Sequence, residues 1–269
     1  MKYFVVDAFA DELFKGNPAG VCFIMKWPGD DLLQEIAAEN NMAETAFIVE
    51  NGNDYDLRWF TPTTEIDLCG HGTLASAFII MNFYNKNKEM ISFNTKSGVL
   101  TVERKMKNKM ELYELDFPSR KTYKVDIDQT VQTAINARIQ EAYLSRDLLL
   151  LVDTENEVQN LIIDMDLLMT VTNCHGFIVT APSANKEYDF VSRYFAPNVG
   201  INEDHVTGSS HTTLIPFWSE RLNKNVLTAR QLSKRGGTLY CENKGSRVKI
   251  SGKAKLYLEG EIKINEYTE

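Results

Sequence analysis

The chain carries one pattern of residues twice, and this duplication limits its possible folds more than any other feature. In the first half, an apolar run at 46–49 is followed by RWFTP at 58–62; in the second, an apolar run at 176–179 is followed by RYFAP at 193–197. Matching segments that recur in the same order are the signature of a repeated structural unit. We therefore predict a chain built from two similar halves.

A turn of small residues follows each copy of this pattern. The turns read CGHGT at 69–73 and TGSSH at 207–211, and each leads into a segment of helical composition. Residues 74–81 are small or apolar all round, which indicates a helix that is buried on most faces. Residues 212–218 have a weaker helical propensity, and we expect Pro216 to kink this second helix or to shift its start.

Strand-like stretches surround both predicted helices. Those of the first half are 3–9, 21–25, 45–50, 56–60, 90–94, 100–105 and 110–117. Those of the second half are 148–153, 176–180, 189–195, 237–241, 247–251 and 254–262. The predicted fold class is α+β, with two pseudo-symmetric halves, each a curved, mostly antiparallel, barrel-like sheet around a central helix.

Two further helices and a polar link set the predicted domain boundary. Apolar residues at helical spacing predict a surface helix over 31–40, with Asp30 or Asp31 as its N-cap. Another helix is predicted over 130–143, after a polar link at 119–128. With the boundary in that link, the predicted domains are 1–118, completed by 258–269, and 119–257.

Composition restricts the class of partner. The chain has 269 residues, 43% of them hydrophobic, with a net charge of −8 and a pI near 5.2. Nucleic-acid and anionic-membrane surfaces are built from clustered Lys and Arg, so we expect no nucleic acid and no membrane as partner. No export signal or membrane-length apolar run is recognisable, which favours a cytoplasmic protein that acts on small molecules. Four dispersed cysteines and four histidines without ligand spacing predict no disulfide and no metal.

The two predicted helix starts suggest a binding site. If both face one cleft, their unpaired N–H groups and positive dipole ends favour an anion such as a carboxylate. Those donors would also stabilise negative charge that develops on a neighbouring carbon. His71 and Ser209 stand at equivalent places, after Gly70 and Gly208. Helix capping is a sufficient explanation for Ser209, but histidine is not a favoured cap, so we interpret His71 as functional.

Two carboxylates are candidates for acid/base chemistry. Glu44 ends a polar turn and precedes an apolar strand, so its partly desolvated carboxyl could exchange a proton near neutral pH. The alternative for Glu44 is a solvated turn residue or a charge that flanks a helix. Asp204 could serve as a second acid/base group, or equally as an N-cap or Asx-turn residue.

Six short motifs give the chain its resemblance to a known family. In chain order they are DAF at 7–9, GNPAG at 16–20, AETAF at 43–47, RWFTP at 58–62, CGHGT at 69–73 and EDHVTGS at 203–209. Together they resemble the phenazine-biosynthesis F-protein (PhzF-like) family, which shares its fold with diaminopimelate epimerase. The likeness runs from Lys2 to about Leu258.

The resemblance implies a cofactor-independent isomerase that acts on a small carboxylate-bearing substrate. In the name-giving member, a proton moves between carbons of a dihydro-hydroxyanthranilate. It implies that Glu44 is the acid/base, with Asp204 assisting proton movement. Substrate binding would fall to His71, Ser209 and the helix-start residues Gly70, Gly72, Thr73 and Gly208. A homodimer without cofactor is also implied. His205 and Ser210 depart from the pattern, standing where proline and alanine are common, and so leave the substrate open.

Two other functions stay open. Racemases of the related fold use two cysteine thiolates, one from each repeat; Cys69 matches the first position, but Thr207 stands at the second. A hydroxyl cannot replace a thiol there at neutral pH, so two-thiol racemisation is disfavoured. The other alternative is a non-catalytic small-molecule-binding protein that kept the fold.

Overall fold

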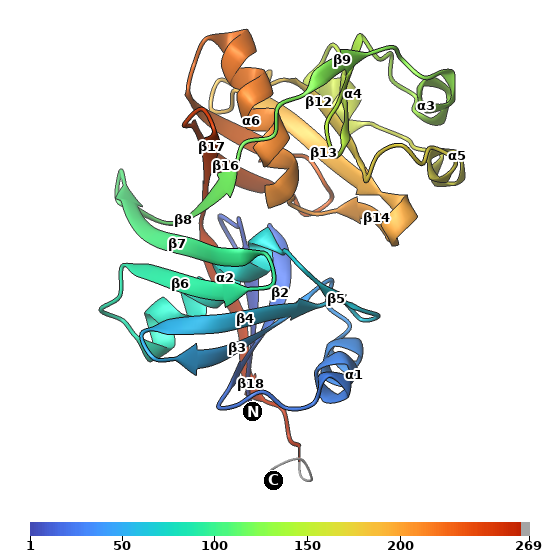
Figure 1. Cartoon of the computed structure of the whole chain (residues 1–269). Helices are drawn as coiled ribbons and strands as arrows, with labels where there is room; N and C mark the ends of the chain where they lie inside the picture. The colour runs from blue at the N-terminus through green and yellow to red at the C-terminus, as the bar shows by residue number, and fades with distance from the viewer. Residues whose placement is uncertain (265–269) are drawn as a thin grey trace. The chain divides into compact units, whose positions relative to one another are not determined.

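The computed structural model describes residues 1–264 and divides into two compact units (Figure 1). The first unit comprises Met1–Asp116 and the described residues from Ser251 onward, and the second comprises Phe117–Ile250. The chain thus returns to the first unit at 250/251, whereas we predicted 257/258, and so the whole of β18 (Ala254–Glu261) belongs to the first unit. Residues 265–269 of the predicted C-terminal part lie outside the described residues.

The first unit is a mixed, mostly antiparallel sheet. Its strands, in spatial order, are β18, β1 (Lys2–Ala8), β2 (Asn17–Ile24), β3 (Thr45–Asn51), β4 (Asp54–Phe60), β6 (Met90–Thr95), β7 (Gly98–Lys107) and β8 (Met110–Pro118), with β5 (Glu65–Ile66) beside β4. Neighbouring strands are antiparallel except at β2–β3 and β4–β6, where they are parallel.

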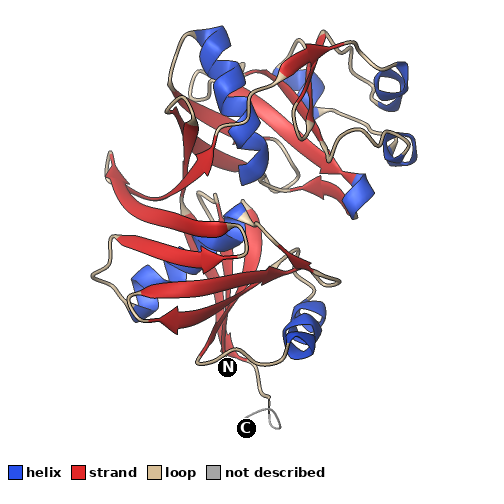
Figure 2. Ribbon diagram, in the orientation of Figure 1, coloured by secondary structure: helices blue, strands red, loops and turns tan. Residues whose placement is uncertain are grey.

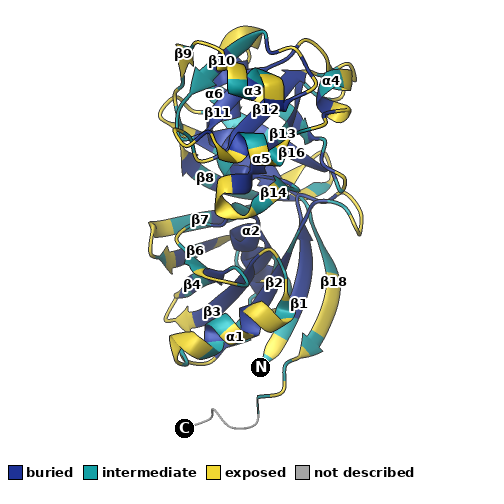
Figure 3. Cartoon of the chain, turned by 90° about the vertical axis from the view of Figure 1, so that its right-hand side faces the viewer, coloured by how far each residue is buried: buried dark blue, intermediate teal, exposed yellow. Residues whose placement is uncertain are grey.

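Helix α2 (Gly70–Ile79) continues into the π-helical turn η1 (Ile80–Tyr84) and packs against β1, β2 and β3. Nearly every residue of α2 is buried, as the dark blue of Figure 3 shows. Small side chains such as Ala75 and Ala77 let the strands approach the helix closely, which confirms the buried helix predicted from composition.

Helix α1 (Asp30–Asn40) buries Leu33, Ile36 and Ala37 against the same unit, as predicted. Its N-cap is Gly29, which makes no side-chain cap bond, so the predicted capping by Asp30 or Asp31 is wrong. Both carboxylates lie instead in the first turn, where they interact favourably with the helix dipole.

The second unit repeats the strand order of the first. Strands, with a smaller number of helices, make up both units (Figure 2). Its strands are β9 (Tyr123–Val125), β10 (Glu141–Leu144), β11 (Leu148–Leu151), β12 (Phe177–Pro182), β13 (Phe190–Ala196), β15 (Val226–Gln231), β16 (Gly237–Asn243) and β17 (Arg247–Gly252), with β14 (Ile201–Asp204) beside β13. The parallel neighbours are β11–β12 and β13–β15, the same two places in the order as in the first unit. The predicted duplication is therefore present in the topology.

The short helices of the second unit correct one prediction. They are α3 (Gln129–Ala134), α4 (Glu155–Gln159), α5 (Met165–Met169) and the 3₁₀ turn η2 (Pro197–Val199). The helix predicted over 130–143 is wrong beyond Ala134, because 141–144 forms strand β10. Strand β10 pairs with the apolar strand β11, so tertiary pairing outweighs the local helical pattern.

Helix α6 (Gly208–Leu222) runs without interruption through Pro216, so Pro216 does not shift its start as we expected. Proline has no N–H to give to the carbonyl four residues earlier, which belongs to Thr212. That carbonyl accepts a hydrogen bond from the backbone N–H of Arg120, at 2.9 Å. An external donor therefore replaces the missing bond.

None of the helices within residues 1–264 combines the length and the apolar character that a membrane-spanning helix needs.

Strand pairing shifts the alignment of the two repeats. The sequence pattern places Phe47 level with Phe177, but Phe47 pairs with Arg58 and Val179 pairs with Arg193. The repeats are thus offset by two residues from the sequence alignment at this strand. The residue that precedes β3 is Glu44, and its counterpart before β12 is Gly176.

Candidate active site

The first turn of α2 is held by its N-cap residue, Cys69. The Sγ of Cys69 accepts a hydrogen bond from the N–H of Gly72 at 3.3 Å, and the carbonyl of Cys69 accepts from Thr73 Oγ1 at 2.6 Å. The N–H of Thr73 also donates to that carbonyl. Gly72 and Thr73 were predicted to bind substrate. Their N–H groups and the hydroxyl of Thr73 instead donate hydrogen bonds to Cys69 inside the start of α2.

Glu44 and His71 form a buried pair at this helix start. Glu44 is 8% exposed and His71 5% exposed, and Glu44 Oε2 lies 2.9 Å from His71 Nε2. The other ring nitrogen, Nδ1, lies 3.2 Å from Nδ2 of Asn17. Burial by itself would lower the pKa of His71, but the nearby Cys69 and Glu44 outweigh it and raise that pKa well above its usual value. The protonated imidazole thus forms a buried ion pair with the Glu44 carboxylate.

Cys69 also contacts this pair, with Sγ 3.6 Å from His71 Nδ1. Burial raises the pKa of the Cys69 thiol, and the positive charge of His71 offsets only part of this effect. Glu44, Cys69 and His71 place one ligand atom each within 4.8 Å of one another, which is a donor set that could hold a metal such as zinc. Glu44 Oε2 and His71 Nε2 form an ion pair at 2.9 Å, and Oε2 has no hydrogen bond of good geometry among the described residues.

Gly72 leaves no room for a side chain at this site. A Cβ added there would meet Cδ1 of Trp59 at 2.9 Å and Cys69 Sγ at 3.0 Å. Trp59 is 1% exposed, and its Nε1 has no hydrogen-bond partner within residues 1–264. The glycine in the motif is therefore explained by the close approach of the indole ring.

In the second unit, Asp204 ends β14 and binds the N-cap residue of α6. Its Oδ2 accepts a hydrogen bond from Thr207 Oγ1 at 2.5 Å, and the N–H of Thr207 donates to Gln231 Oε1 at 2.9 Å. Thr207 is the N-cap but makes no side-chain cap bond. Asp204 is therefore not the N-cap, which was one of the two structural interpretations of its sequence position.

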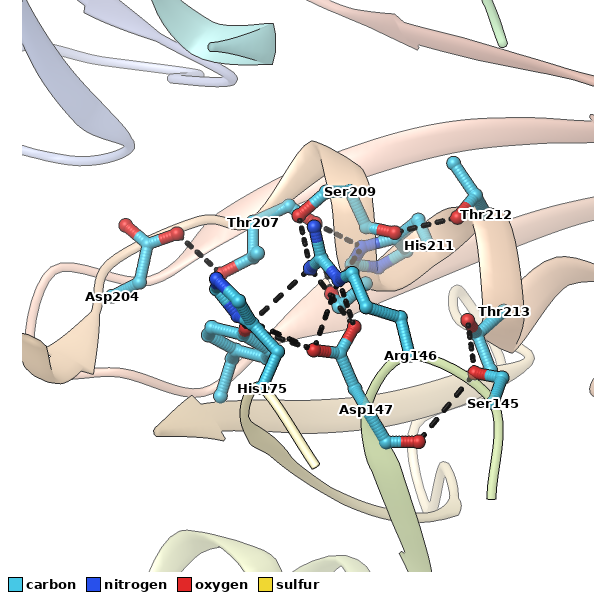
Figure 4. A network of polar contacts seen from close by, with 12 residues as sticks. Ser145, Arg146, Asp147, His175, Asp204, Thr207, Ser209, His211, Thr212 and Thr213 are labelled. Carbon is cyan, nitrogen blue, oxygen red and sulfur yellow. Dashed lines mark hydrogen bonds and ion pairs between the residues drawn. The ribbon is translucent and has the colours of Figure 1, made fainter. Parts of the chain in front are cut away.

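Ser209 lies in the first turn of α6, directly after Gly208, as predicted. Its Oγ lies 3.2 Å from Nη2 of Arg146, which also bonds Asp147 Oδ2 at 2.9 Å (Figure 4). The hydroxyl of Tyr194 donates to Asp147 Oδ1 at 3.1 Å and lies 3.3 Å from His175 Nδ1. Ser209 is thus one member of a polar network at the start of α6.

His211, one turn into α6, is fully buried and lies 2.8 Å through its Nδ1 from the carbonyl of Thr207. Burial lowers the pKa of His211 to about 4, despite the opposing hydrogen bond to Thr207. This histidine is neutral at pH 7 and has a structural role.

Sequence reasoning missed part of both clusters. In the first unit it missed the contact of Asn17 with His71, although Asn17 lies in the recognised motif GNPAG. In the second it missed Arg146, Asp147, His175 and Tyr194. One signal was available, because Arg146 and Asp147 directly precede the apolar run 148–152. A charge pair at that place marks the start of a buried strand.

The chain belongs to the family of phenazine biosynthesis-like proteins, since the sequence model of that family, PhzC-PhzF, matches residues 6–260. An uncharacterized isomerase of Pseudomonas aeruginosa is 44% identical to it over 97% of this chain and 98% of the relative. The crystal structure of a PhzF-family protein from Enterococcus faecalis is 47% identical, with a TM-score of 0.94 over 98% of this chain and 99% of that one.

A more distant structure supports the fold alone. A probable proline racemase from Agrobacterium radiobacter has a TM-score of 0.65 at 11% identity, over 99% of this chain and 94% of that one. The predicted α+β fold of PhzF and epimerase type is confirmed by these likenesses.

Proposed function

We propose that the chain is an isomerase that moves a proton between carbons of a small carboxylate-bearing substrate, with Glu44 as the acid/base. The observation that carries the proposal is the buried Glu44–His71 pair at the start of α2, with Oε2 and Nε2 2.9 Å apart. The curated relative from Pseudomonas, which is named an isomerase, supports the same class of reaction.

The proposed reaction needs only a proton and a site for transient negative charge. The ionised carboxylate of Glu44 removes a proton from one carbon of the substrate, and the electron pair moves into the adjoining π-system. The neutral carboxyl then delivers a proton to another carbon, either the one it took or one exchanged with solvent, so the overall change is redox-neutral. His71, when it is protonated, is the ion-pair partner of the Glu44 carboxylate at 2.9 Å.

The helix start would stabilise the anion that forms between these steps. Gly70 and His71 present backbone N–H groups in the first turn of α2, where the dipole is positive. One well-placed donor of this kind contributes roughly 3–4 kcal/mol to such a step. Asp204 and Ser209, at the start of α6, would bind and orient substrate.

A racemase that pairs Glu44 with Cys69 is the second candidate, because Cys69 Sγ lies 3.6 Å from His71 Nδ1. Its thiol is disfavoured as a base, since burial raises the pKa of Cys69 and only the thiolate removes a proton efficiently. A non-catalytic binding protein is the third. It has no need for a carboxylate buried against an imidazole, which costs desolvation energy.

Deuterium incorporation tests the proposal. The purified protein is incubated in deuterium oxide with dihydro-hydroxyanthranilate and a panel of amino and hydroxy acids, and proton NMR follows the carbon-bound hydrogens. We expect exchange with the wild-type protein and a loss of about 10³-fold or more in Glu44→Gln, the scale of acid/base catalysis. The matched control is Glu50→Gln, an exposed carboxylate on the same strand β3, which should exchange at the wild-type rate. Undiminished exchange in Glu44→Gln would refute the role of Glu44.

A further inference from the structure

Arg146 in the second unit is held in place by a carboxylate that has no access to solvent. Its Nε lies 3.2 Å from both carboxylate oxygens of Asp147, and its Nη2 lies 2.9 Å from Oδ2 (Figure 4). The side chain of Asp147 is 0% exposed, whereas that of Arg146 is 31% exposed. Asp147 thus orients one edge of the guanidinium. The Nη2 of Arg146 also donates a hydrogen bond to Ser209 Oγ at 3.2 Å.

Arg120 is a second guanidinium in the same neighbourhood. Its backbone N–H bonds the carbonyl of Thr212, which Pro216 leaves without a helical donor, so Arg120 is fixed beside the first turns of α6. Its Nη1 is buried and has no hydrogen-bond partner among the described residues. Burial and the positive charge of Arg146 lower the pKa of Arg120, and the charge of Asp147 opposes this effect only in part.

The neighbouring groups leave the buried Nη1 of Arg120 without an acceptor among the described residues. Asp147 bonds the guanidinium of Arg146. His175 cannot help, and burial together with the charges of Arg146 and Arg120 lowers its pKa, so it is neutral at pH 7. Asp204, the other carboxylate of the network, is bonded to the hydroxyl of Thr207. A buried N–H without an acceptor beside two like charges is costly unless an anion completes the site.

We propose that Arg120, Arg146 and Ser209 form a binding subsite for one carboxylate group. A carboxylate has two oxygens that can accept from the two guanidiniums and a hydroxyl, and it would supply the acceptor that Arg120 Nη1 lacks. The ligand is either the carboxylate of the substrate proposed above, in which case the inference rests on that function, or a separate small carboxylic acid.

A purely structural role makes a different prediction for Arg120. A structural arginine would be expected to pair with an acceptor, and its loss would destabilise the fold. A ligand-binding arginine that is desolvated and repelled by Arg146 lowers the stability of the ligand-free protein, as binding residues often do. Replacing Arg120 therefore separates the two roles.

The first experiment is calorimetric titration of the full-length protein with acetate, benzoate and anthranilate, and with anthranilamide as the uncharged counterpart of anthranilate. We expect the wild-type protein to bind at least one acid and to bind it about tenfold or more tightly than does Arg120→Gln, the equivalent of losing one charge-assisted hydrogen bond. The melting temperature of ligand-free Arg120→Gln should equal or exceed that of the wild type. Lys224→Gln, an exposed lysine of the same unit paired with Asp189, is the control for lost charge and should bind as the wild type does.

The second variant removes the Arg146–Asp147 pair without leaving a buried charge. Arg146→Gln combined with Asp147→Asn should fold and should also lose acid binding, while anthranilamide binding stays unchanged. The proposal is overturned if the wild-type protein binds none of the three acids, or if Arg120→Gln binds them with wild-type affinity.

The two proposals fail independently. Glu44→Gln should still bind the acid, because Glu44 is not part of this subsite; if Glu44→Gln also keeps its exchange activity, only the proposed function fails. Once a substrate is known, Arg120→Gln distinguishes the sources of the carboxylate. A KM raised about tenfold with kcat nearly kept identifies the substrate's own group, and an unchanged KM identifies a separate acid.

Discussion

The two repeats place different chemistry at the same structural position. Each begins its buried helix after a non-helical N-cap, Cys69 in α2 and Thr207 in α6. The residue before the parallel strand is Glu44 in the first repeat and Gly176 in the second, as the strand pairing requires. The duplicated frame is therefore retained, while the carboxylate that we propose as the acid/base occurs at this position in the first copy and not in the second.

The second repeat has a carboxylate too, but from another strand and with another partner. A Cβ on Gly176 would lie 2.4 Å from the hydroxyl of Tyr194, which bonds Asp147 at the start of β11. Asp147 pairs with an arginine, whose charge is permanent, whereas Glu44 pairs with a histidine, which can release its proton. We infer that the first repeat is equipped to move a proton and the second to hold a fixed charge.

The largest expected effect tests this difference between a permanent and a releasable charge. Arg146→Gln leaves the Asp147 carboxylate, 0% exposed, without its arginine partner, and should lower the free energy of unfolding by about 3–5 kcal/mol. Glu44→Gln should cost only about 1 kcal/mol, because His71 can become neutral. Urea unfolding measures both. Equal losses would contradict the assigned difference, and adding Asp147→Asn to Arg146→Gln should restore most of the stability.

The pH dependence of stability should come from His211 with a defined sign. Its folded pKa of about 4 lies below the unfolded value of about 6.5, so its contribution is present above pH 6.5 and is lost as pH falls toward 4. At roughly 1.4 kcal/mol per pKa unit the full loss is about 3.5 kcal/mol, of which about 2.5 kcal/mol falls between pH 7.5 and 4.5. His71 has the opposite sign, since its raised folded pKa makes its contribution full below about 6.5 and lost as pH rises through that folded value.

Urea unfolding between pH 7.5 and 4.5 checks this prediction. The acid-dependent loss should be smaller by about that amount in His211→Gln, whose amide can still donate to the carbonyl of Thr207. His71→Gln should not reduce the acid loss. If the free energy of unfolding fell equally with pH in the wild type and in His211→Gln, a group other than His211 would be responsible for the loss.

A smaller effect on stability is expected at Gly72 and Gly176, each of which lies in close contact with an aromatic side chain of its own repeat. Gly176→Ala should destabilise by about 2–3 kcal/mol, because its Cβ would meet both the Tyr194 hydroxyl at 2.4 Å and the backbone oxygen of Phe195 at 3.0 Å. Gly72→Ala should cost about 1–2 kcal/mol, since its closest contact is Trp59 Cδ1 at 2.9 Å. Thermal unfolding compares them with Gly29→Ala, where a Cβ meets nothing within 4 Å. If Gly29→Ala lost as much stability as Gly176→Ala and Gly72→Ala, a steric clash of the added Cβ could not be the cause of their losses.

The sequence predicted the duplication and most strands because apolar patterning and glycine-rich turns act locally. It also predicted the places of Glu44 and His71, since a motif fixes both the turn and the residue. It failed where a distant segment decides the local structure. The helix predicted beyond Ala134 is replaced by β10 through pairing with β11, and Pro216 is accommodated because Arg120 supplies the missing hydrogen bond.

The same limit applies to the second-unit cluster. Arg146 and Asp147 are adjacent in sequence, and nothing local indicates that Ser209 lies 3.2 Å from the guanidinium. The two-residue offset between the repeats was hidden for a related reason. Phe47 and Phe177 align with each other in the sequence. The structural equivalence of the two strands is set only by the pairing of β3 with β4 and of β12 with β13.

The smallest expected effect separates the proposed isomerase from a thiol-dependent racemase. In Cys69→Ser the hydroxyl takes over the hydrogen bond from the N–H of Gly72, and serine is a favoured N-cap, so the stability should stay the same within about 0.5 kcal/mol.

Carbon-bound deuterium exchange in Cys69→Ser should fall by less than about tenfold, because the burial that raises the pKa of the Cys69 thiol disfavours it as a base. Cys69→Ala is the control, since it lacks both the thiol and the cap and should lose about 1 kcal/mol of stability. A loss of several orders of magnitude in both variants would make the thiol a base and shift the assignment to a racemase. Thr207→Cys completes the comparison: a second thiol added at the equivalent cap of α6 should not create racemase activity if the second repeat is equipped to bind charge and not to move a proton.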